Sequence, residues 1–322
     1  MKQLATVATL AVATVGLGAA PVLAEFPEEP ITLVVSFAAG GNADIVARLS
    51  AEAVGQELGV PITVVNRPGG AHIPAAMSVV EADADGYTIF NWSPPSFMLV
   101  PLTRGTPYDP LEDFVPLFAG ISASNALYVR ADSPYETFEQ FIEAARTENF
   151  TMGVNNLGAP PNLSAVQLAS EFDLEFRTIV LDTVPATMTG LIGGQVDAAV
   201  GQVQSISQFG DEVRALAILD NARTPSMEDF LPGVPTVGEA FPGMEAGVWV
   251  HGGWAVPAGT PQEVVDTLLE ATEVLGSPEF IESLPPGVGY TWVHGTEEVQ
   301  GLIQSGRDLY TPILESLGLL SQ

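Results

Sequence analysis

The sequence contains no cysteine and only three histidines, His72, His251 and His294. Without cysteine there are no disulfides, no thiolate nucleophile and no Cys-ligated zinc or iron–sulfur centre, and so few histidines argue against a His-rich metal site. We therefore expect neither a metal nor another cofactor.

Positive charge is also scarce, with 10 Lys and Arg against 39 Asp and Glu and a formal charge of −29. Nucleic-acid binding needs cationic surface to displace counterions, and anionic lipid repels a chain of this sign. The charge therefore rules out sequence-independent binding to nucleic acid and disfavours docking on anionic lipid. The 322 residues are 47% hydrophobic and 15% charged, which suits a folded chain of two domains.

The first 24 residues have the pattern of an export signal. Lys2 supplies a short positive end, Leu4–Ala20 is apolar, and small residues at Val22–Ala24 suit a signal peptidase. The alternative is a membrane anchor, but the apolar run is shorter than the roughly 20 residues of a spanning helix and Pro21 ends it. We predict cleavage after Ala24, export to a periplasm and no stable membrane insertion.

Short apolar runs alternate with helical patterns along the rest of the chain. The almost continuous run Ile31–Phe37 is typical of a strand buried on both faces. Further strands are predicted at Ile62–Val65, Tyr87–Phe90, Ala126–Val129, Thr151–Val154, Arg177–Leu181, Val196–Val200, Arg214–Leu219 and Val248–Val256. Helices are predicted after residue 42 up to the stop at Gly59, at Thr137–Arg146, Leu163–Phe172 and Met188–Ile192, and through most of the chain from Pro261. This order predicts two α/β units in tandem, with the C-terminal segment packed back on the first.

The strongest candidate for a binding site follows the first strand. There a buried strand ends, two glycines allow a tight turn and a helix begins, in the order Phe37, Ala38, Ala39, Gly40, Gly41, Asn42, Ala43 and Asp44. Unpaired N–H groups and the positive end of the helix then face the carboxyl edge of the sheet, where a carboxylate or phosphate fits. The alternative is an ordinary glycine turn in which Asp44 offsets the helix dipole. The loop lacks the glycine and lysine spacing of nucleotide-binding loops.

Two further loops are weaker candidates. Gly158 and Asn162 lie in the equivalent strand-to-helix loop of the second unit, and we favour a helix-capping role for Asn162 over ligand contact. After the third strand, Ser93 and Ser96 offer hydroxyl groups and Trp92 is a candidate pocket wall, although a core position is equally consistent with an aromatic residue.

Catalytic signatures are missing. The sequence has no GxSxG elbow and no HExxH motif, and His72 and His251 suit structural roles in a glycine-rich turn and a strand. We predict that the protein is not an enzyme.

A series of motifs spread over the chain resembles one family, the periplasmic substrate-binding proteins of tripartite tricarboxylate transporters (Bug/TctC). They are the opening strand and loop 30–44 with Ala47 and Arg48, Asn66–Gly70, Asp85–Thr88, Tyr108–Pro110 with Asp113 and Phe114, Leu191–Asp197, Val234–Thr236 with Glu239, and Pro257–Pro261. Each motif is weak by itself, but their order and spacing together are specific.

The resemblance implies a type II periplasmic binding-protein fold with two doubly wound α/β lobes that close on a ligand. Lobe 1 would comprise residues 25–124 and 247–322, and lobe 2 residues 125–246. The ligand would be a small organic carboxylate, held by backbone amides, hydroxyls and waters. The receptor would deliver it to a membrane permease with one large and one small subunit. A sensor that presents its ligand to a membrane signalling partner, and less favourably a secreted enzyme, are the alternatives.

The second lobe departs from the family pattern. Val180–Thr183 stands where the family often has Pro-Tyr-Lys-Gly, so Asp182 and Thr183 replace a basic and a small residue. We expect one carboxylate to bind at Phe37–Asp44 and the distal part of the ligand to meet Trp92, Asn162 and Asp182. Trp92 would favour a flat or apolar group there, and Asp182 an amino or hydroxyl group.

Overall fold

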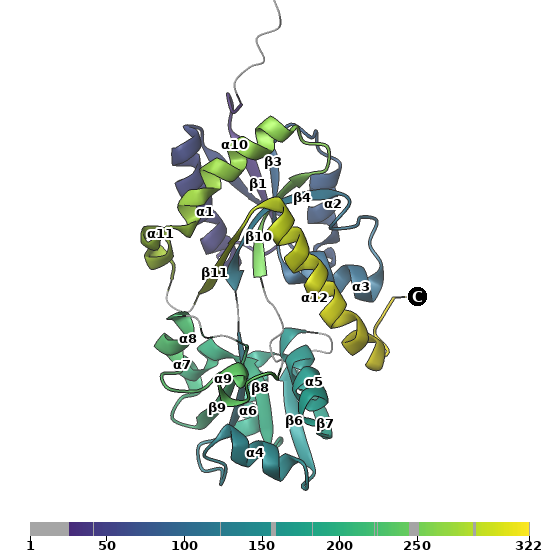
Figure 1. The fold of residues 1–322 in the computed structure, drawn as a ribbon, viewed down its shortest axis with the longest axis vertical. Coiled ribbons are helices and arrows are strands. Elements are labelled where there is room, and N and C mark those ends of the chain that lie inside the picture. Colours follow the sequence, from purple (N-terminus) through teal and green to yellow (C-terminus); the bar gives the residue numbers. More distant parts are fainter. Residues whose placement is uncertain are drawn as a thin grey trace, which may run out of the picture.

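The protein has two lobes stacked along its long axis (Figure 1). The structure, a computed structural model, describes residues 26–40, 42–122, 124–155, 159–181, 183–221, 223, 225–244, 251–285 and 288–321. The predicted signal segment lies outside these residues. In the described part of the chain, no helix combines the length and the apolar character needed to cross a bilayer.

Lobe 1, the upper lobe in Figure 1, is built on a six-stranded sheet that draws on both ends of the chain. Its strands, in spatial order, are β11 (Gly289–His294), β4 (Phe114–Ser122), β10 (His251–Pro257), β3 (Thr88–Trp92), β1 (Ile31–Val35) and β2 (Ile62–Asn66). Its helices are α1 (Asn42–Leu58), α2 (Ile73–Val80), α3 (Val100–Arg104), α10 (Gln262–Thr272), α11 (Pro278–Ser283) and α12 (Thr296–Ser316), with short helical turns η1 (Gly70–His72), η2 (Pro95–Leu99) and η4 (Glu273–Gly276).

Lobe 2 is a five-stranded sheet made from the middle of the chain. Its strands, in spatial order, are β7 (Phe176–Leu181), β6 (Phe150–Asn155), β8 (Ala198–Gln202), β5 (Asn125–Arg130) and β9 (Val213–Leu219). Its helices are α4 (Phe138–Ala145), α5 (Pro160–Phe172), α6 (Val184–Ile192), α7 (Ile206–Phe209), α8 (Pro225–Phe230) and α9 (Val237–Ala240), with the turn η3 (Val203–Ser205).

Both sheets follow the same topology. In lobe 1, β2, β1 and β3 are parallel neighbours, and the antiparallel strand β10 lies beside β3. In lobe 2, β7, β6 and β8 are parallel neighbours, and the antiparallel strand β5 lies beside β8. Each antiparallel strand belongs to the segment that has just crossed from the other lobe. This repeated arrangement confirms the predicted fold of two α/β lobes joined by two crossings.

The inner strands form because their side chains are buried on both faces of each sheet, whereas the edge strands β2 and β7 are more exposed. Ile31, Leu33 and Val35 of β1 belong to the cluster under α1 and α10, whereas Val34 belongs to the cluster on the opposite face. Each such side chain contributes about 1.5–3 kcal/mol when it is fully buried. Lobe 2 alternates in the same way, with Leu127 of β5 in one cluster and Tyr128 in the other.

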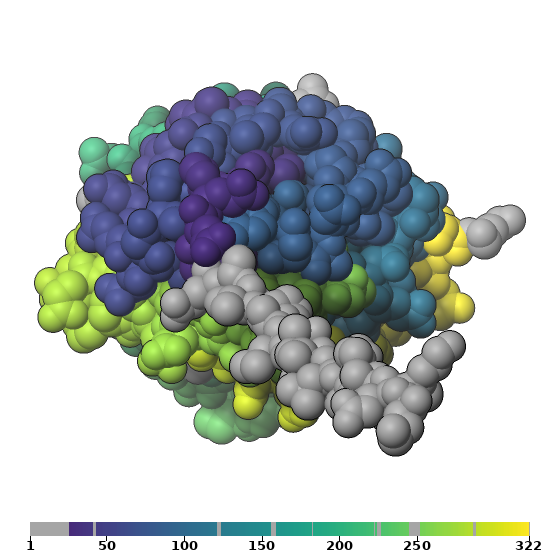
Figure 2. Space-filling model, turned by 90° about the horizontal axis from the view of Figure 1, so that it is seen from above, coloured from purple at the N-terminus to yellow at the C-terminus, as the bar shows by residue number. Residues whose placement is uncertain are grey.

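The two ends of the described chain meet in lobe 1. Helices α1 and α10 are in contact, and Figure 2 shows N-terminal (purple to blue) and C-terminal (lime) residues sharing the surface at this end of the molecule. Lobe 1 is therefore complete only when residues beyond the second crossing have joined it.

The lobes also touch each other through side chains. Leu163 of α5, fully buried, belongs to the same hydrophobic cluster as Trp92, Phe97 and Tyr310 of lobe 1, with Val166 packed against it. Helix α12 runs down the side of lobe 1 to α5, and these two helices are in contact (Figure 1). The N-terminal half of α5 is thus part of the core of the opposite lobe.

Two strands were missed by the sequence prediction, and one helix role was wrong. Strand β4 contains Pro116, which argues against a strand, yet Pro116 lies where the pairing with β10 shifts register, a position that accommodates proline. Strand β11 interrupts a stretch that was predicted to be mainly helical. Asn162 does not cap its helix, because α5 begins at Pro160 with Ala159 as its N-cap.

Candidate functional site

The loops that follow the parallel strands lie at one edge of each sheet, and the described residues of the predicted site are in or next to these loops. In open α/β sheets ligands bind outside the carboxyl ends of the strands. In lobe 1 these loops follow β1, β2 and β3, and in lobe 2 they follow β6, β7 and β8.

The loop after β1 is fixed by the buried carboxylate of Asp44. This carboxylate accepts the backbone N–H of Gly40 at 2.8 Å, Nε and Nη2 of Arg48 at 3.0 and 2.9 Å, and Nδ2 of Asn66 at 2.8 Å. The hydrogen bonds from Arg48 hold the pKa of Asp44 at about 2, against the opposing effect of its burial. Asp44 is therefore ionised at neutral pH, and its charge is balanced inside the protein.

The remaining residues of this loop lie at the surface. Ala38, Ala39 and Gly40 are exposed and Phe37 is half-buried, with its carbonyl accepting Nδ2 of Asn66 at 3.1 Å. Gly41 lies outside the described residues, and Asn42 is the first residue of α1. The amide of Gly40 is already used by Asp44, so it is not one of the free amides that the sequence led us to expect.

The turn after β2 has an unusual backbone. Gly69, Gly70, Ala71 and His72 all have positive φ, at 96°, 56°, 53° and 68°. For a residue with a Cβ, the left-handed conformation is roughly 1–2 kcal/mol higher in free energy than the right-handed one, so Ala71 and His72 are strained here. Nδ1 of His72 lies 3.0 Å from Oγ of Ser36, and its ring centroid lies 4.9 Å from that of Phe37. The turn also packs on η2, so it touches the loops after both β1 and β3.

The loop after β3 is buried. Trp92 is fully buried and stacks in parallel on Phe97, with ring centroids 5.1 Å apart. The hydroxyls of Ser93 and Ser96 lie 3.3 Å apart, and the Ser96 hydroxyl also accepts the N–H of Ser93 at 3.0 Å. Phe97 thus covers one face of the indole. In the described part of the chain, Nε1 of Trp92 has no hydrogen-bond partner.

Polar residues of lobe 2 lie at the matching edge of the second sheet. Asn162 is buried in the first turn of α5, one residue before Leu163. Nδ2 of Asn125 donates to Oγ of Ser164 at 3.0 Å, which ties β5 to the same helix. At the carboxyl end of β6, Oδ1 of Asn155 is buried and has no partner among the described residues.

Of the other residues predicted in lobe 2, the structure describes only Thr183, which has a local role. Thr183 is exposed and caps α6, its hydroxyl accepting the N–H of Ala186 at 3.2 Å. Gly158 and Asp182 lie outside the described residues.

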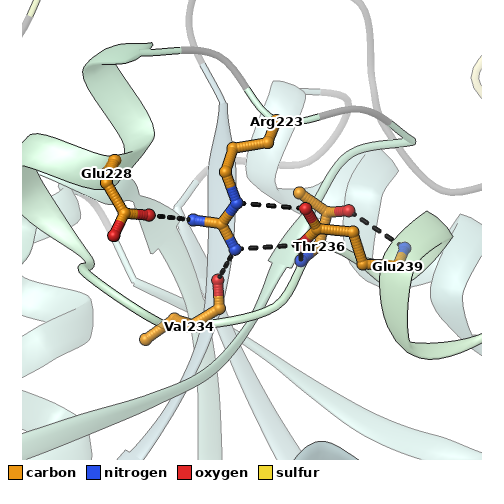
Figure 3. Close-up of polar contacts among 5 residues, drawn as sticks. All are labelled: Arg223, Glu228, Val234, Thr236 and Glu239. Atoms are coloured by element: carbon orange, nitrogen blue, oxygen red, sulfur yellow. Dashed lines mark hydrogen bonds and ion pairs between the residues drawn. The ribbon is translucent and has the colours of Figure 1, made fainter.

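The chain on either side of the crossings is held by polar contacts. Oγ of Ser124, at the first crossing, donates to Asp220 at 3.0 Å. Before the second crossing, Arg223 bonds to Glu239 through Nε and Nη2 at 3.1 and 2.9 Å, to Glu228 through Nη1 at 2.6 Å, and to the carbonyl of Val234 (Figure 3). One arginine thus fastens α8 and α9 to the loop between them.

The sequence analysis did not single out three residues that shape the loops or the contact between the lobes. Asn66 was interpreted only as the start of a turn, His72 as a structural histidine, and Leu163 as an ordinary residue of a lobe 2 helix. The glycines at 69 and 70 were the only signal that a left-handed turn was present. Within the described residues, no group of three or more His, Asp or Glu side chains is arranged to hold a metal ion.

Residues 46–319 match the family model described as the tripartite tricarboxylate transporter family receptor. A relative from a Pseudomonas species, named UPF0065 protein in the tcbD–tcbE intergenic region, is 31% identical over 281 residues, which cover 85% of this chain and 82% of that protein. A TctC solute-binding protein from Polaromonas superposes with a TM-score of 0.80 at 26% identity, over 90% of this chain and 99% of that one. R. palustris Rpa4515 with adipate superposes with a TM-score of 0.70 at 26% identity, over 92% of this chain and 99% of that one.

Proposed function

The chain belongs to the tripartite tricarboxylate transporter receptor family, and from this premise we propose that it captures a small organic carboxylate and delivers it to a membrane permease with one large and one small subunit. Membership confirms the resemblance predicted from the motifs. The family consists of solute-binding receptors and not of enzymes, so we further propose that the ligand leaves the protein chemically unchanged.

A carboxylate ligand is supported by a solved relative and by the chemistry of the first loop. The structure of R. palustris Rpa4515, 26% identical to this chain, was solved with the dicarboxylate adipate. Here the exposed segment Ala38–Gly40 at the carboxyl edge of the sheet precedes the N-terminus of the 17-residue helix α1. Helix N-termini favour negative charge, and Asp44 fixes the shape of the loop in front of this one.

The observation that carries the proposal is a pair of buried polar atoms without partners, one in each lobe. Trp92 is the last residue of β3, and Asn155 is the last residue of β6. In the described part of the chain, neither Nε1 of Trp92 nor Oδ1 of Asn155 has a hydrogen bond. An unsatisfied buried polar group costs about 1–3 kcal/mol. A carboxylate oxygen can accept from Trp92, and a ligand hydroxyl or an ordered water can donate to Asn155.

The ligand residues predicted from the sequence are kept in this proposal with one change. The loop Phe37–Asp44, Ser93 and Ser96 would contribute lobe 1 contacts, and Gly158, Asn162, Asp182 and Thr183 lobe 2 contacts. Because Phe97 covers one face of Trp92, we propose that Trp92 meets the ligand through its N–H group, where the sequence suggested a flat wall. Lobe 1 would comprise residues 25–124 and 247–322, and lobe 2 residues 125–246.

Binding would draw the lobes together around the acid. Contacts from one ligand to both lobes favour the closed arrangement over the open one by their differential affinity. Leu163 belongs to lobe 2 and lies in a hydrophobic cluster of lobe 1, so we propose that this contact separates on opening. We propose that the protein acts in the periplasm, after removal of residues 1–24 as a signal peptide.

A thermal-shift screen of the chain from residue 25 tests the proposal. Succinate, malate, adipate and citrate are offered, with glucose as a control of similar size. An acid present at 100 times its dissociation constant should stabilise the protein by about 2.7 kcal/mol. Stabilisation by glucose and by none of the acids would contradict the carboxylate assignment. Recovery of an altered acid after incubation would contradict the non-enzymatic role.

A further inference from the structure

The loop that is proposed to receive the acid has no uncommitted positive charge of its own. Arg48 is paired with Asp44 and also donates to Oδ1 of Asn66 at 2.9 Å. The amide of Gly40 is likewise taken by Asp44. A chain with a formal charge of −29 repels an anion at long range, so a local compensating charge is needed when the acid is desolvated.

His72 is the titratable side chain placed to supply that charge. Its ring packs on Phe37 at the start of the loop, and Nδ1 is held 3.0 Å from the hydroxyl of Ser36. In the part of the chain that the structure describes, Nε2 of His72 has no hydrogen-bond partner, and it is not sealed away from solvent. The backbone keeps this orientation although φ of 68° is unfavourable for histidine.

From this geometry, and resting on the proposed function, we propose that His72 is a ligand-contacting residue, and that Nε2 meets a carboxylate of the bound acid with uptake of one proton. The proton balance is simple: the imidazole gains a proton from solvent, and the acid stays a carboxylate. Ser36 then positions the ring, and the strained turn Gly69–His72 keeps Nε2 at the carboxyl edge of the sheet.

The other groups around the turn do not provide this charge. Helix α2 and turn η2, which pack on it, carry no charged side chain, and neither do residues 36–40. Asp44 and Arg48 of α1 neutralise each other. Arg67 precedes the turn, but its side chain is exposed, where water and salt screen its charge.

The state of His72 before binding fits this role. Burial lowers the pKa of His72 below its ordinary value in the unliganded protein, so the ring is neutral at neutral pH. A carboxylate within hydrogen-bonding distance favours the protonated ring and raises its pKa. Between the lower pKa of the free protein and the raised pKa of the complex, affinity therefore falls as pH rises.

Calorimetric titration of the chain from residue 25 with succinate, malate, adipate and citrate, between pH 6.5 and 8.5, tests the proposal. Succinate, malate and adipate are largely ionised in this range. Citrate loses its last proton near the lower end, so its binding is compared only above about pH 7.5, where the titration of the acids themselves contributes little. We expect the association constant to fall by up to about tenfold per pH unit. Titrations in HEPES and in Tris, whose ionisation enthalpies differ, should report uptake of up to one proton at neutral pH without the need for a variant.

His72→Asn is the matched variant, because asparagine tolerates the left-handed conformation. It should bind the acid more weakly at pH 6.5 and lose both the pH dependence and the proton uptake. His294→Gln, in β11, and Arg67→Gln should keep the wild-type pH dependence, and Arg67→Gln should lose affinity mainly at low salt. Ser36→Ala should weaken binding and retain proton uptake.

Two results would overturn the proposal while leaving the carboxylate function intact: binding that is independent of pH in the wild type, or an unchanged pH dependence in His72→Asn. Absence of binding by all four acids at every pH would contradict the proposed function and this inference together.

Discussion

The carboxylate of Asp44 accepts the backbone N–H of Gly40, four residues earlier in the chain, at 2.8 Å. This bond closes the turn between β1 and α1, and Arg48 and Asn66 complete the coordination of the same carboxylate. Asp44 therefore stabilises the conformation of the loop. The shape of the loop depends on the charge of Asp44.

Asp44→Asn should lower the free energy of unfolding at pH 7 by about 1–2 kcal/mol, because charge-assisted bonds to a buried group are lost. Since the pKa of Asp44 is about 2 in the folded protein, below its ordinary value of 3.8, its contribution is complete above 3.8 and fades as pH falls towards 2. Urea unfolding at pH 7 and pH 3 should show the difference between wild type and variant shrinking at pH 3. A difference that grows on acidification would contradict the assignment.

The Arg223 cluster should depend more on its helix cap than on its charges. Glu239 and Thr236 form a capping box, and the side chains of Arg223 and Glu239 are 26% and 44% exposed. Thr236→Ala should cost about 1 kcal/mol, whereas Glu239→Gln, which can still accept the N–H of Thr236, should cost less at pH 7. Chemical denaturation of both variants should show the larger loss of stability for Thr236→Ala.

The stabilisation from the Arg223 cluster should decrease at low pH. Arg223 and the backbone N–H of Thr236 hold the pKa of Glu239 at about 2, below its ordinary value of 4.5. The stabilisation is present above pH 4.5 and is lost as pH falls through that interval. The stability difference between wild type and Glu239→Gln should therefore decrease between pH 5 and pH 2, and Glu228→Gln, which removes a single bond to Arg223, is the control.

Leu163→Ala should open the lobes. Leu163 is fully buried in the lobe 1 cluster although it belongs to lobe 2, so its truncation weakens the contact between lobes. We expect a larger radius of gyration in solution scattering and weaker acid binding, because the closed state is less populated. Leu168→Ala is the matched control: Leu168 lies in the cluster of lobe 2 itself, and its loss should cost about 2–5 kcal/mol without opening the molecule. Equal scattering from wild type and Leu163→Ala would refute the role of this contact.

Two glycines of α12 should respond in opposite directions. A Cβ at Gly301 meets nothing within 4 Å, so Gly301→Ala should stabilise the protein by about 1 kcal/mol through helix propensity. At Gly306 a Cβ would lie 2.5 Å from Sδ of Met98, so Gly306→Ala should cost about 1 kcal/mol net. Thermal unfolding of the two variants should show a higher melting temperature for Gly301→Ala and a lower one for Gly306→Ala.

The inner parallel strands β1, β3, β6 and β8 were predictable because they are buried on both faces. An almost continuous apolar run such as Ile31–Val35 has few other interpretations, and the predicted start at Ile31 agrees with β1. β4 was hidden by Pro116, whose tolerance depends on a register shift in a strand far away in sequence. The start of α5 was readable in principle, since Pro160 occupies the first helical position, where proline is favoured.

The site was predictable by place and less so by role. The sequence located the loop after β1. Only the three-dimensional arrangement shows that Asn66, 22 residues after Asp44, donates to the Asp44 carboxylate together with Arg48. The sequence could not show that Phe97 stacks on one face of Trp92, or that Leu163 of lobe 2 packs in a hydrophobic cluster of lobe 1. These relationships depend on how distant segments pack, which local patterns do not encode.

The two crossings of the chain between the lobes favour an order of assembly. The five strands of lobe 2 lie between Asn125 and Leu219, so that sheet can close as soon as this stretch of chain is available. The sheet of lobe 1 waits for β10 and β11, which arrive only with residues 251–294, and until then β3 and β4 lack the strand between them. The middle of the chain is thus able to mature first, while the N-terminal strands expose unpaired edges that a chaperone or a secretion apparatus would have to shield.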